Sequence, residues 1–125
     1  PAERLRHTAS IDHNNGLWVY GGDTNSGGDD ELYFLDLAVN KTWTQITATG
    51  KPSSRRGHTA VIDNSNVLWV FGGQDISSNS YLDDLYSLDL QAEAKSWTLV
   101  TASSSPSARY FHTTAIDSTS GMWVF

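Results

Sequence analysis

An arginine stands three residues before a histidine at three places in the chain: Arg4 and His7, Arg55 and His58, and Arg109 and His112. Three imidazoles brought together could bind a metal ion, and guanidinium groups bind carboxylates through paired hydrogen bonds. Because the pair recurs along the chain, the simpler interpretation is structural. We expect each histidine to be hydrogen-bonded inside its own repeat, and we predict no metal site and no cofactor at these positions.

A second candidate is the oxygen-rich stretch 23–31, in which Asp23, Asp29, Asp30 and Glu31 alternate with other polar residues. Alternating oxygen ligands are typical of calcium-binding loops. The corresponding stretch 74–79 lacks this spacing, so a solvated turn is the better interpretation. No cysteine is present, and no Ser-His-Asp arrangement or close carboxylate pair stands out beyond the repeated positions. We therefore expect no catalytic residue and no enzyme activity here.

These residues lie on elements that repeat. The run Leu17–Gly22 (LWVYGG) returns as Leu68–Gly73 (LWVFGG) and begins again at Met122–Phe125 (MWVF). A short apolar run closed by two glycines predicts a buried strand followed by a turn. A period of about 50 residues with several short strands per unit is typical of a β-propeller. We divide the chain into a first repeat (1–50), a second (51–104) and the start of a third (105–125).

Each full repeat predicts four strands. In the first repeat they lie near 4–12, 17–20, 31–37 and 42–46, and in the second near 55–63, 68–71, 84–90 and 96–100. The first strand has small residues that suit a crowded inner position, whereas the tryptophans of the others could fill the space between blades. The structural positions are Gly21, Gly22, Gly72, Gly73, Trp43, Trp97, His7, His58 and His112. The expected fold is all-β, with four-stranded antiparallel blades, about two and a half of them present.

The pattern closely resembles the kelch repeat, whose features appear here as Arg55 and His58, Gly72-Gly73, Tyr86 and Trp97. The resemblance implies a propeller of about five to seven blades, so we expect these residues to be a piece of a longer chain or of an assembly. In kelch adaptor proteins, arginines at the matching positions line a pocket for acidic peptides. This implies such a role for Arg4, Arg55 and Arg109, although each arginine could instead brace its own blade.

The amino-acid composition restricts the kinds of molecule that the chain can bind. The formal net charge is −6, which disfavours binding to nucleic acid and to anionic membranes, and no apolar run is long enough to cross a membrane. Without cysteine there is no disulfide framework. This suits a reducing compartment and favours an intracellular, cytoplasmic location.

The charges divide between the two ends of the blades. The loops after the second strand and the links between repeats share one end, called here the loop end, and it carries Arg4, Arg6, Lys51, Arg55, Arg56 and Arg109 together with several acidic residues. The opposite end carries Asp12, Asp36, Asp63, Asp89, Glu93 and Asp117 against only Lys41 and Lys95. We therefore expect an acidic surface at that end.

The expected function is a non-enzymatic protein-interaction scaffold that presents the loop end. The candidate partner-binding residues are Arg4, Arg55, Arg56, Arg109, Asp23, Gln74, Asp75, Tyr81 and Tyr110. The expected partners are proteins, including ones with an acidic peptide motif, and the remaining blades of the same chain or neighbouring subunits. Two alternatives stay open: a structural piece of a large assembly, or a propeller domain of an enzyme or carbohydrate-binding protein whose active residues lie elsewhere.

Overall fold

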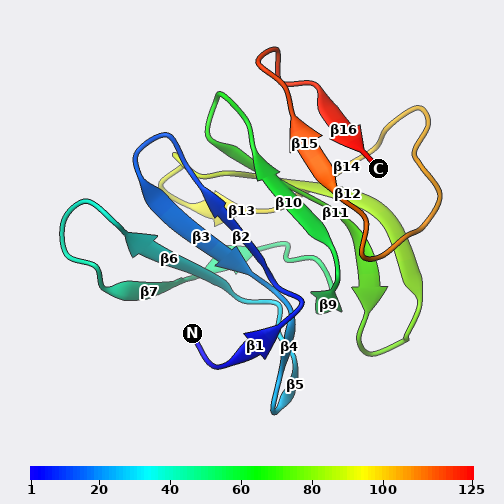
Figure 1. Cartoon of the computed structure of the whole chain (residues 1–125), viewed down its shortest axis with the longest axis horizontal. Helices are drawn as coiled ribbons and strands as arrows, with labels where there is room; N and C mark the ends of the chain where they lie inside the picture. The colour runs from blue at the N-terminus through cyan, green and yellow to red at the C-terminus, as the bar shows by residue number, and fades with distance from the viewer.

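The computed structural model describes all 125 residues, and its regular structure consists entirely of β-strands (Figure 1). The prediction of an all-β chain with antiparallel four-stranded blades is confirmed. No segment forms a helix that could span a membrane.

Blade 1 is a four-stranded antiparallel sheet in the order β2-β3-β6-β7. Its strands are β2 (Thr8–Ile11), β3 (Gly16–Tyr20), β6 (Leu32–Asp36) and β7 (Trp43–Ile46). Successive side chains of a strand point to opposite faces, so Trp18 and Tyr20 of β3 share the face that packs on blade 2. At the loop end, β1 (Arg4–Leu5), β4 (Asp23–Thr24) and β5 (Gly27–Gly28) form a small additional sheet.

Blade 2 repeats this order with longer central strands. Its strands are β10 (Thr59–Ile62), β11 (Val67–Asp75), β12 (Tyr81–Asp89) and β14 (Thr98–Val100), and β9 (Arg55–Arg56) pairs with the end of β11. The outermost strand, expected over 96–100, is interrupted at Trp97. Just before it, β13 (Lys95–Ser96) pairs in parallel with β8 (Ala48–Thr49), and the Trp97 N–H donates to the Thr49 carbonyl at 2.9 Å. The edge of blade 2 is thereby tied to the link that leaves blade 1.

The third unit is an antiparallel hairpin of β15 (Thr114–Ile116) and β16 (Met122–Val124). The first strands of the three units, β2, β10 and β15, lie next to one another, and the later strands of the first two units fan out from them (Figure 1). The small residues of these strands allow this close approach: Ser10 Oγ of β2 donates to the Ala60 carbonyl of β10 at 3.2 Å.

The main hydrophobic core lies between blades 1 and 2. It contains Trp18, Tyr20, Leu32, Ala48, Leu68, Val70, Leu88, Leu90 and Trp97. The Trp97 ring packs on Tyr20 with centroids 5.0 Å apart and is only 5% exposed. Its counterpart in blade 1, Trp43, is 40% exposed because no blade packs on that face in the structure. The hydrophobic core therefore forms between adjacent blades and not within one blade, as expected for a repeat protein.

Candidate functional site

The loop end is built on the glycine pairs. All four glycines have positive φ: 65° at Gly21, 97° at Gly22, 61° at Gly72 and 96° at Gly73. A Cβ at Gly21 would lie 2.8 Å from Cε1 of His58 in the next blade. The N–H groups of Gly22 and Gly73 each donate, at 2.9 Å, to the carbonyl of the arginine that opens the next repeat. Glycine is required here because the backbones of adjacent blades meet at this point.

The histidines connect adjacent blades. Nε2 of His58 shares a hydrogen bond with Oγ1 of Thr8 in blade 1 (2.9 Å), and Nε2 of His112 shares one with Oγ1 of Thr59 in blade 2 (2.8 Å). The expectation that each histidine bonds within its own repeat is therefore wrong for His58 and His112. Burial, followed by the charge of Arg55, lowers the pKa of His58 to about 3. No three His, Asp or Glu side chains gather closely enough to hold a metal ion.

Arg55 is an internal brace of blade 2. Its side chain is fully buried, Nη1 donates to the Gly72 carbonyl at 3.0 Å, and the guanidinium makes a bidentate pair with Asp84 at 2.6 and 2.8 Å. Arg4 repeats the arrangement in blade 1, with its own bond to the Gly21 carbonyl at 3.0 Å. The structure therefore leaves the Arg55 guanidinium no free surface to offer a partner, contrary to the role implied by the resemblance.

Arg109 is the least enclosed of the three. Its Nε donates to the Ser107 carbonyl at 3.0 Å, as Arg55 Nε does to Ser53 at 3.1 Å, but it makes no ion pair in this chain. It remains a candidate for contact with a partner or with a further blade.

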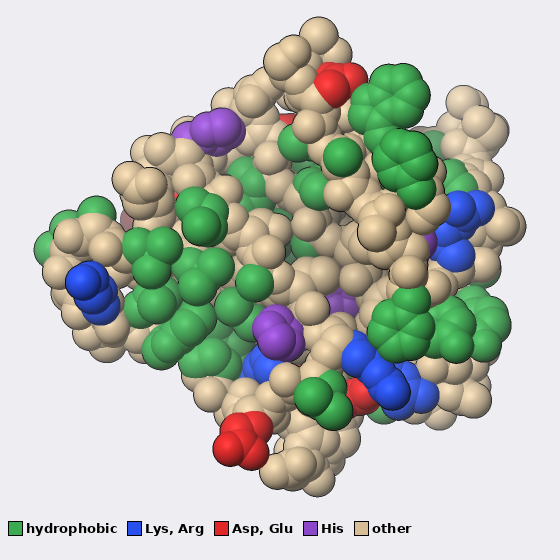
Figure 2. All heavy atoms as spheres, in the orientation of Figure 1, with side chains coloured by type: hydrophobic (Ala, Val, Ile, Leu, Met, Phe, Trp, Pro, Cys, Tyr) green, Lys and Arg blue, Asp and Glu red, His purple; other side chains and the backbone are tan.

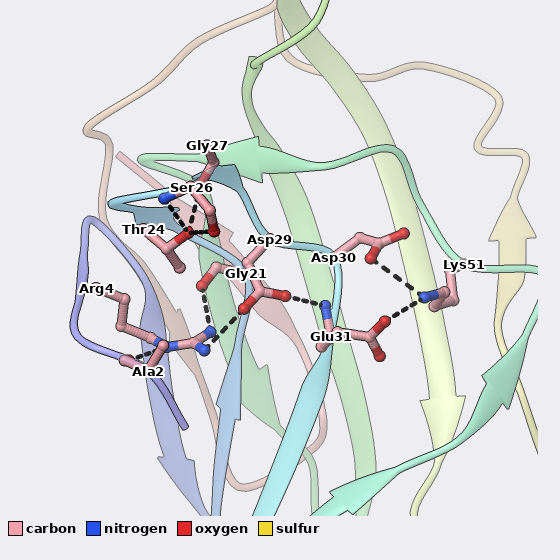
Figure 3. Close-up of polar contacts among 10 residues, drawn as sticks. All are labelled: Ala2, Arg4, Gly21, Thr24, Ser26, Gly27, Asp29, Asp30, Glu31 and Lys51. Carbon is pink, nitrogen blue, oxygen red and sulfur yellow. Dashed lines mark hydrogen bonds and ion pairs between the residues drawn. The ribbon is translucent and has the colours of Figure 1, made fainter.

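The calcium-like stretch 23–31 is neutralised by cations of the chain itself (Figure 3). Asp29 accepts an ion pair from Arg4 at 2.7 Å, and Lys51 Nζ lies 3.1 Å from Asp30 and 3.0 Å from Glu31. The hydrogen bond to Lys51 lowers the pKa of Glu31 and raises the pKa of Lys51. Asp30 and Glu31 therefore fasten the loop of blade 1 to the link between the blades, and Asp29 fastens the same loop to β1.

Gln74 and Asp75 have a comparable role in blade 2. Both are buried, at 7% and 8% exposure. Asp75 Oδ1 accepts from the backbone N–H groups of Ser77 and Ser78 and from the Ser77 hydroxyl, which is the main reason why its pKa is lowered. Gln74 bonds Asn79 and accepts from Arg56 Nε at 3.0 Å. Both residues shape the hairpin between β11 and β12.

The accessible side chains at the loop end include a row from all three units, called here the loop-end row. Its members are Tyr81, Tyr110, Phe111, Arg6, Asp23 and Arg56. Tyr81 stacks on Tyr110 with centroids 4.8 Å apart, and Tyr110 lies 4.7 Å from Phe111. These three side chains are 53%, 40% and 60% exposed. Figure 2 shows hydrophobic side chains gathered beside Lys or Arg side chains at the lower right, near β9 and the lower ends of β11 and β12.

Sequence reasoning did not identify Phe111 and Arg6 as site residues. The available signal was their shared place directly before a histidine, where the middle repeat has Gly57. A glycine at a repeated position indicates a backbone conformation that other residues rarely adopt. All three residues do have positive φ: 58° at Arg6, 59° at Gly57 and 56° at Phe111.

The opposite end is acidic for structural reasons. Asp12, Asp63 and Asp117 accept the indole N–H of Trp18, Trp69 and Trp123 at 2.8 to 2.9 Å, together with backbone N–H groups of the adjoining turn. The sequence signal for this pairing of aspartate with tryptophan was the constant spacing of the two residues in the three repeats. Asp36 and Asp89 cap turns in the same way. These carboxylates are thus engaged within their own blades.

The repeated sheets, the glycine pairs and the cross-blade histidines define a class of protein, the β-propellers built from blades of about 50 residues. The family model described as the KLHDC2/KLHL20/DRC7 Kelch-repeats domain matches residues 1–125, and the chain belongs to the kelch-repeat family. Domains of this family generally mediate protein–protein interaction and are typically not enzymes.

Two relatives illustrate the range of proteins to which this chain is similar. The chain is 31% identical to Adagio-like protein 3 of Oryza sativa subsp. japonica over 126 residues, covering 100% of the chain and 20% of the relative. It is 34% identical to the Rab9 effector protein with kelch motifs of Danio rerio over 96 residues, covering 74% of the chain and 26% of the relative. The chain thus spans about a fifth to a quarter of the length of these relatives.

Proposed function

We propose that this chain is part of a non-enzymatic interaction scaffold that binds a protein partner through the loop end of its blades. The observation that carries the proposal is the loop-end row, in which three aromatic side chains are exposed together although the neighbouring arginines and carboxylates hold their loops in place. Exposed aromatic and arginine side chains are the residues most enriched at the energetic centres of protein interfaces. One relative is named as a Rab9 effector protein with kelch motifs.

An acidic partner motif is supported by Arg56, which the sequence analysis selects, and by Arg6, which it does not select. Arg55 and Arg4 are committed to internal pairs, whereas Arg6 and Arg56 are 43% and 28% exposed in their side chains. We propose that the acidic contacts of a partner go to Arg6 and Arg56, with Tyr81 and Tyr110 providing the apolar contact.

A display selection tests the proposal. Random peptides are selected against the whole chain and then measured against a double variant, Tyr81→Ser with Tyr110→Ser, and against the control Val39→Ser. Val39 is 80% exposed and lies in the β6–β7 turn at the other end. Peptides that lose binding to the double variant alone support the proposal. Peptides that bind all three proteins equally, or lose binding only to Val39→Ser, overturn it.

A second kind of partner is favoured by the open faces of the blades. A groove of about 340 Å³ next to the β15–β16 hairpin is lined by residues including Phe71, Leu85, Met122 and Val124. The corresponding residues of the preceding interface, Tyr20, Leu32, Leu68 and Val70, form the core around Trp97. We propose that a strand with a matching tryptophan fills this groove, supplied by remaining blades of the chain or by a neighbouring subunit.

A further inference from the structure

Ser105 stands at the repeat position that Lys51 holds in the preceding link. In both links a proline follows directly, and an arginine lies three residues after that proline. In the first link, Lys51 Nζ lies 3.1 Å from Asp30 and 3.0 Å from Glu31. The second link has a neutral serine there, so it lacks the cation that neutralises two carboxylates in the first link.

The carboxylates at the matching positions of blade 2 are Asp83 and Asp84. Asp84 accepts the bidentate pair of Arg55 at 2.6 and 2.8 Å. Asp83 is exposed and makes no ion pair with any cation of the chain. Asp83 and Ser105 line one groove between blade 2 and the third unit. Because serine is short and uncharged, the Asp83 carboxylate is open to a cation from outside the chain.

Arg109 has its main chain beside Asp83 but its guanidinium bonds elsewhere. The Arg109 N–H donates to the Leu82 carbonyl at 3.1 Å. The Arg109 side chain donates to the carbonyl and the hydroxyl of Ser107, at 3.0 and 3.3 Å. The arginine of the second link therefore does not replace the missing lysine.

The aromatic stack of the loop-end row has one end without a cation. Arg6 lies at the Phe111 end, with its guanidinium carbon 5.6 Å from the centre of that ring. Tyr81 forms the other end, where it stacks on Tyr110 at 4.8 Å and is 53% exposed. No arginine or lysine of the chain lies over the Tyr81 ring. The face of a tyrosine ring attracts cations, so Tyr81 offers a second group for one.

Tyr81 and Asp83 lie on the same face of β12. They are two residues apart, and exposure alternates over 81–83, as it does where successive side chains point to opposite faces. Two residues of a strand span about 7 Å. A guanidinium group is planar, stacks on aromatic rings and pairs with carboxylates, so one arginine can use both side chains. Asp30, at the matching position of blade 1, stays 38% exposed beside the packed interface of blades 1 and 2.

We infer that Asp83 and Tyr81 bind an arginine side chain of a protein partner. The guanidinium pairs with the Asp83 carboxylate, as Lys51 does with Asp30 in blade 1, and stacks on the Tyr81 ring. The net charge of −6 attracts a basic segment of this kind. This inference rests on the protein-binding function proposed above and gives its partner a basic residue.

Synthetic peptides test the inference. The probe is the fluorescently labelled peptide GSRFRSG, and its matched controls are GSQFQSG, without charge, and GSKFKSG, with charge but without the guanidinium. Affinities for the whole chain are measured by fluorescence polarisation at about 50 mM salt, where screening of exposed charges is weak. We expect GSQFQSG to bind at least about threefold more weakly than the probe, and GSKFKSG to lie between them. Equal affinity of the probe for its uncharged control overturns the inference, and equal affinity of GSKFKSG overturns the choice of arginine.

Protein variants separate the site from the overall charge. Asp83→Asn should weaken binding of GSRFRSG about threefold or more. Its matched control, Glu93→Gln, removes the same charge from an exposed side chain at the opposite end and should leave binding unchanged. Ser105→Lys should supply the internal cation that Lys51 supplies in blade 1 and should weaken binding as Asp83→Asn does. Ser105→Gln, which is long but uncharged, should bind like the parent. Both positions are exposed, so all four variants should keep the parent's melting temperature.

The outcomes distinguish this inference from the proposed function. Equal effects of Asp83→Asn and Glu93→Gln, or equal effects of the two Ser105 variants, overturn the inference. If display-selected peptides still lose binding to the Tyr81 and Tyr110 double variant in that case, the protein-binding function stands with a different partner chemistry. If no selected peptide responds to that double variant, the proposed function itself fails.

Discussion

Nε2 of His58 lies 2.9 Å from Oγ1 of Thr8, and this hydrogen bond joins the first strand of blade 2 to the first strand of blade 1. The His58 ring also packs edge-on against Tyr20, 5.3 Å away. The same pair of contacts recurs between blades 2 and 3, where His112 meets Thr59 and Phe71. His58 and His112 are thus contacts between blades, and the His58 ring is buried and neutral, whereas His7 is exposed and makes no such contact.

The first prediction concerns acid stability. The folded pKa of His58 is about 3, below its ordinary value of 6.5, so the unfolded chain binds the proton more readily between these values. The stabilisation is therefore fully present above about pH 6.5 and is lost as the pH falls toward 3. The free energy of unfolding should fall with a slope of up to about 1.4 kcal/mol per pH unit from this one group.

Urea denaturation at a series of pH values provides the measurement. His58→Gln should unfold more easily at pH 7 but should show a smaller decrease toward pH 4 than the parent. The acidic groups with lowered pKa values, such as Glu31, contribute in the same direction and are common to both proteins. The difference between the two curves therefore isolates His58, and parallel curves would contradict the assignment.

The second prediction compares two arginines at the same repeat position. Arg55→Ala removes a fully buried guanidinium and leaves Asp84 and the Gly72 carbonyl without their partner, so it should cost about 3 kcal/mol in unfolding free energy. Arg109→Ala should cost less than about 1 kcal/mol, because Arg109 makes only local bonds to Ser107. Chemical denaturation measures both. Equal costs would argue against the bracing role of Arg55.

The third prediction compares two tryptophans. Trp97→Ala should destabilise the chain by about 3 to 5 kcal/mol, because its ring fills the core between blades 1 and 2. Trp43→Ala should cost much less, since Trp43 is 40% exposed in this chain. The two melting temperatures, measured by circular dichroism, provide the comparison. A larger loss for Trp43 would mean that the outer face of blade 1 is packed in solution.

The fourth prediction concerns self-association. Trp43 on blade 1 and Trp123 and Phe125 on the third unit are 40%, 58% and 71% exposed. Apolar faces of this kind promote association between chains. Sedimentation velocity should therefore show species larger than 13.7 kDa, and a double variant, Trp43→Arg with Trp123→Arg, should shift the distribution toward the monomer. A purely monomeric parent protein would contradict the prediction.

The fold was predictable because it depends on local patterns. The apolar runs at Leu17 and Leu68, each ending in two glycines, specify buried strands and turns whatever surrounds them. The interruption at Trp97 was not predictable, because it depends on the pairing of Lys95 and Ser96 with the link after blade 1.

The site was predictable only in part, because each residue's role depends on what lies opposite in space. Arg4 pairs with Asp29 and Arg55 with Asp84, although Asp84 corresponds in the repeat to Glu31 rather than to Asp29. The sequence spacing could not reveal these internal pairs, nor that the partner of His58 would come from the preceding blade. The sequence analysis selects Tyr81 and Tyr110, but their stacking depends on how two separate connections, the β11–β12 hairpin and the β14–β15 link, are arranged in space.

Nuclear magnetic resonance would test the central claim most directly. Amide shifts of the ¹⁵N-labelled chain are followed during titration with the peptide that binds best in the display selection. We predict that the largest shifts fall on the loop end, at Arg6, Gly57, Tyr81, Tyr110 and Phe111. Shifts concentrated instead on the opposite end, around the turns 12–16 and 36–41, would contradict the account.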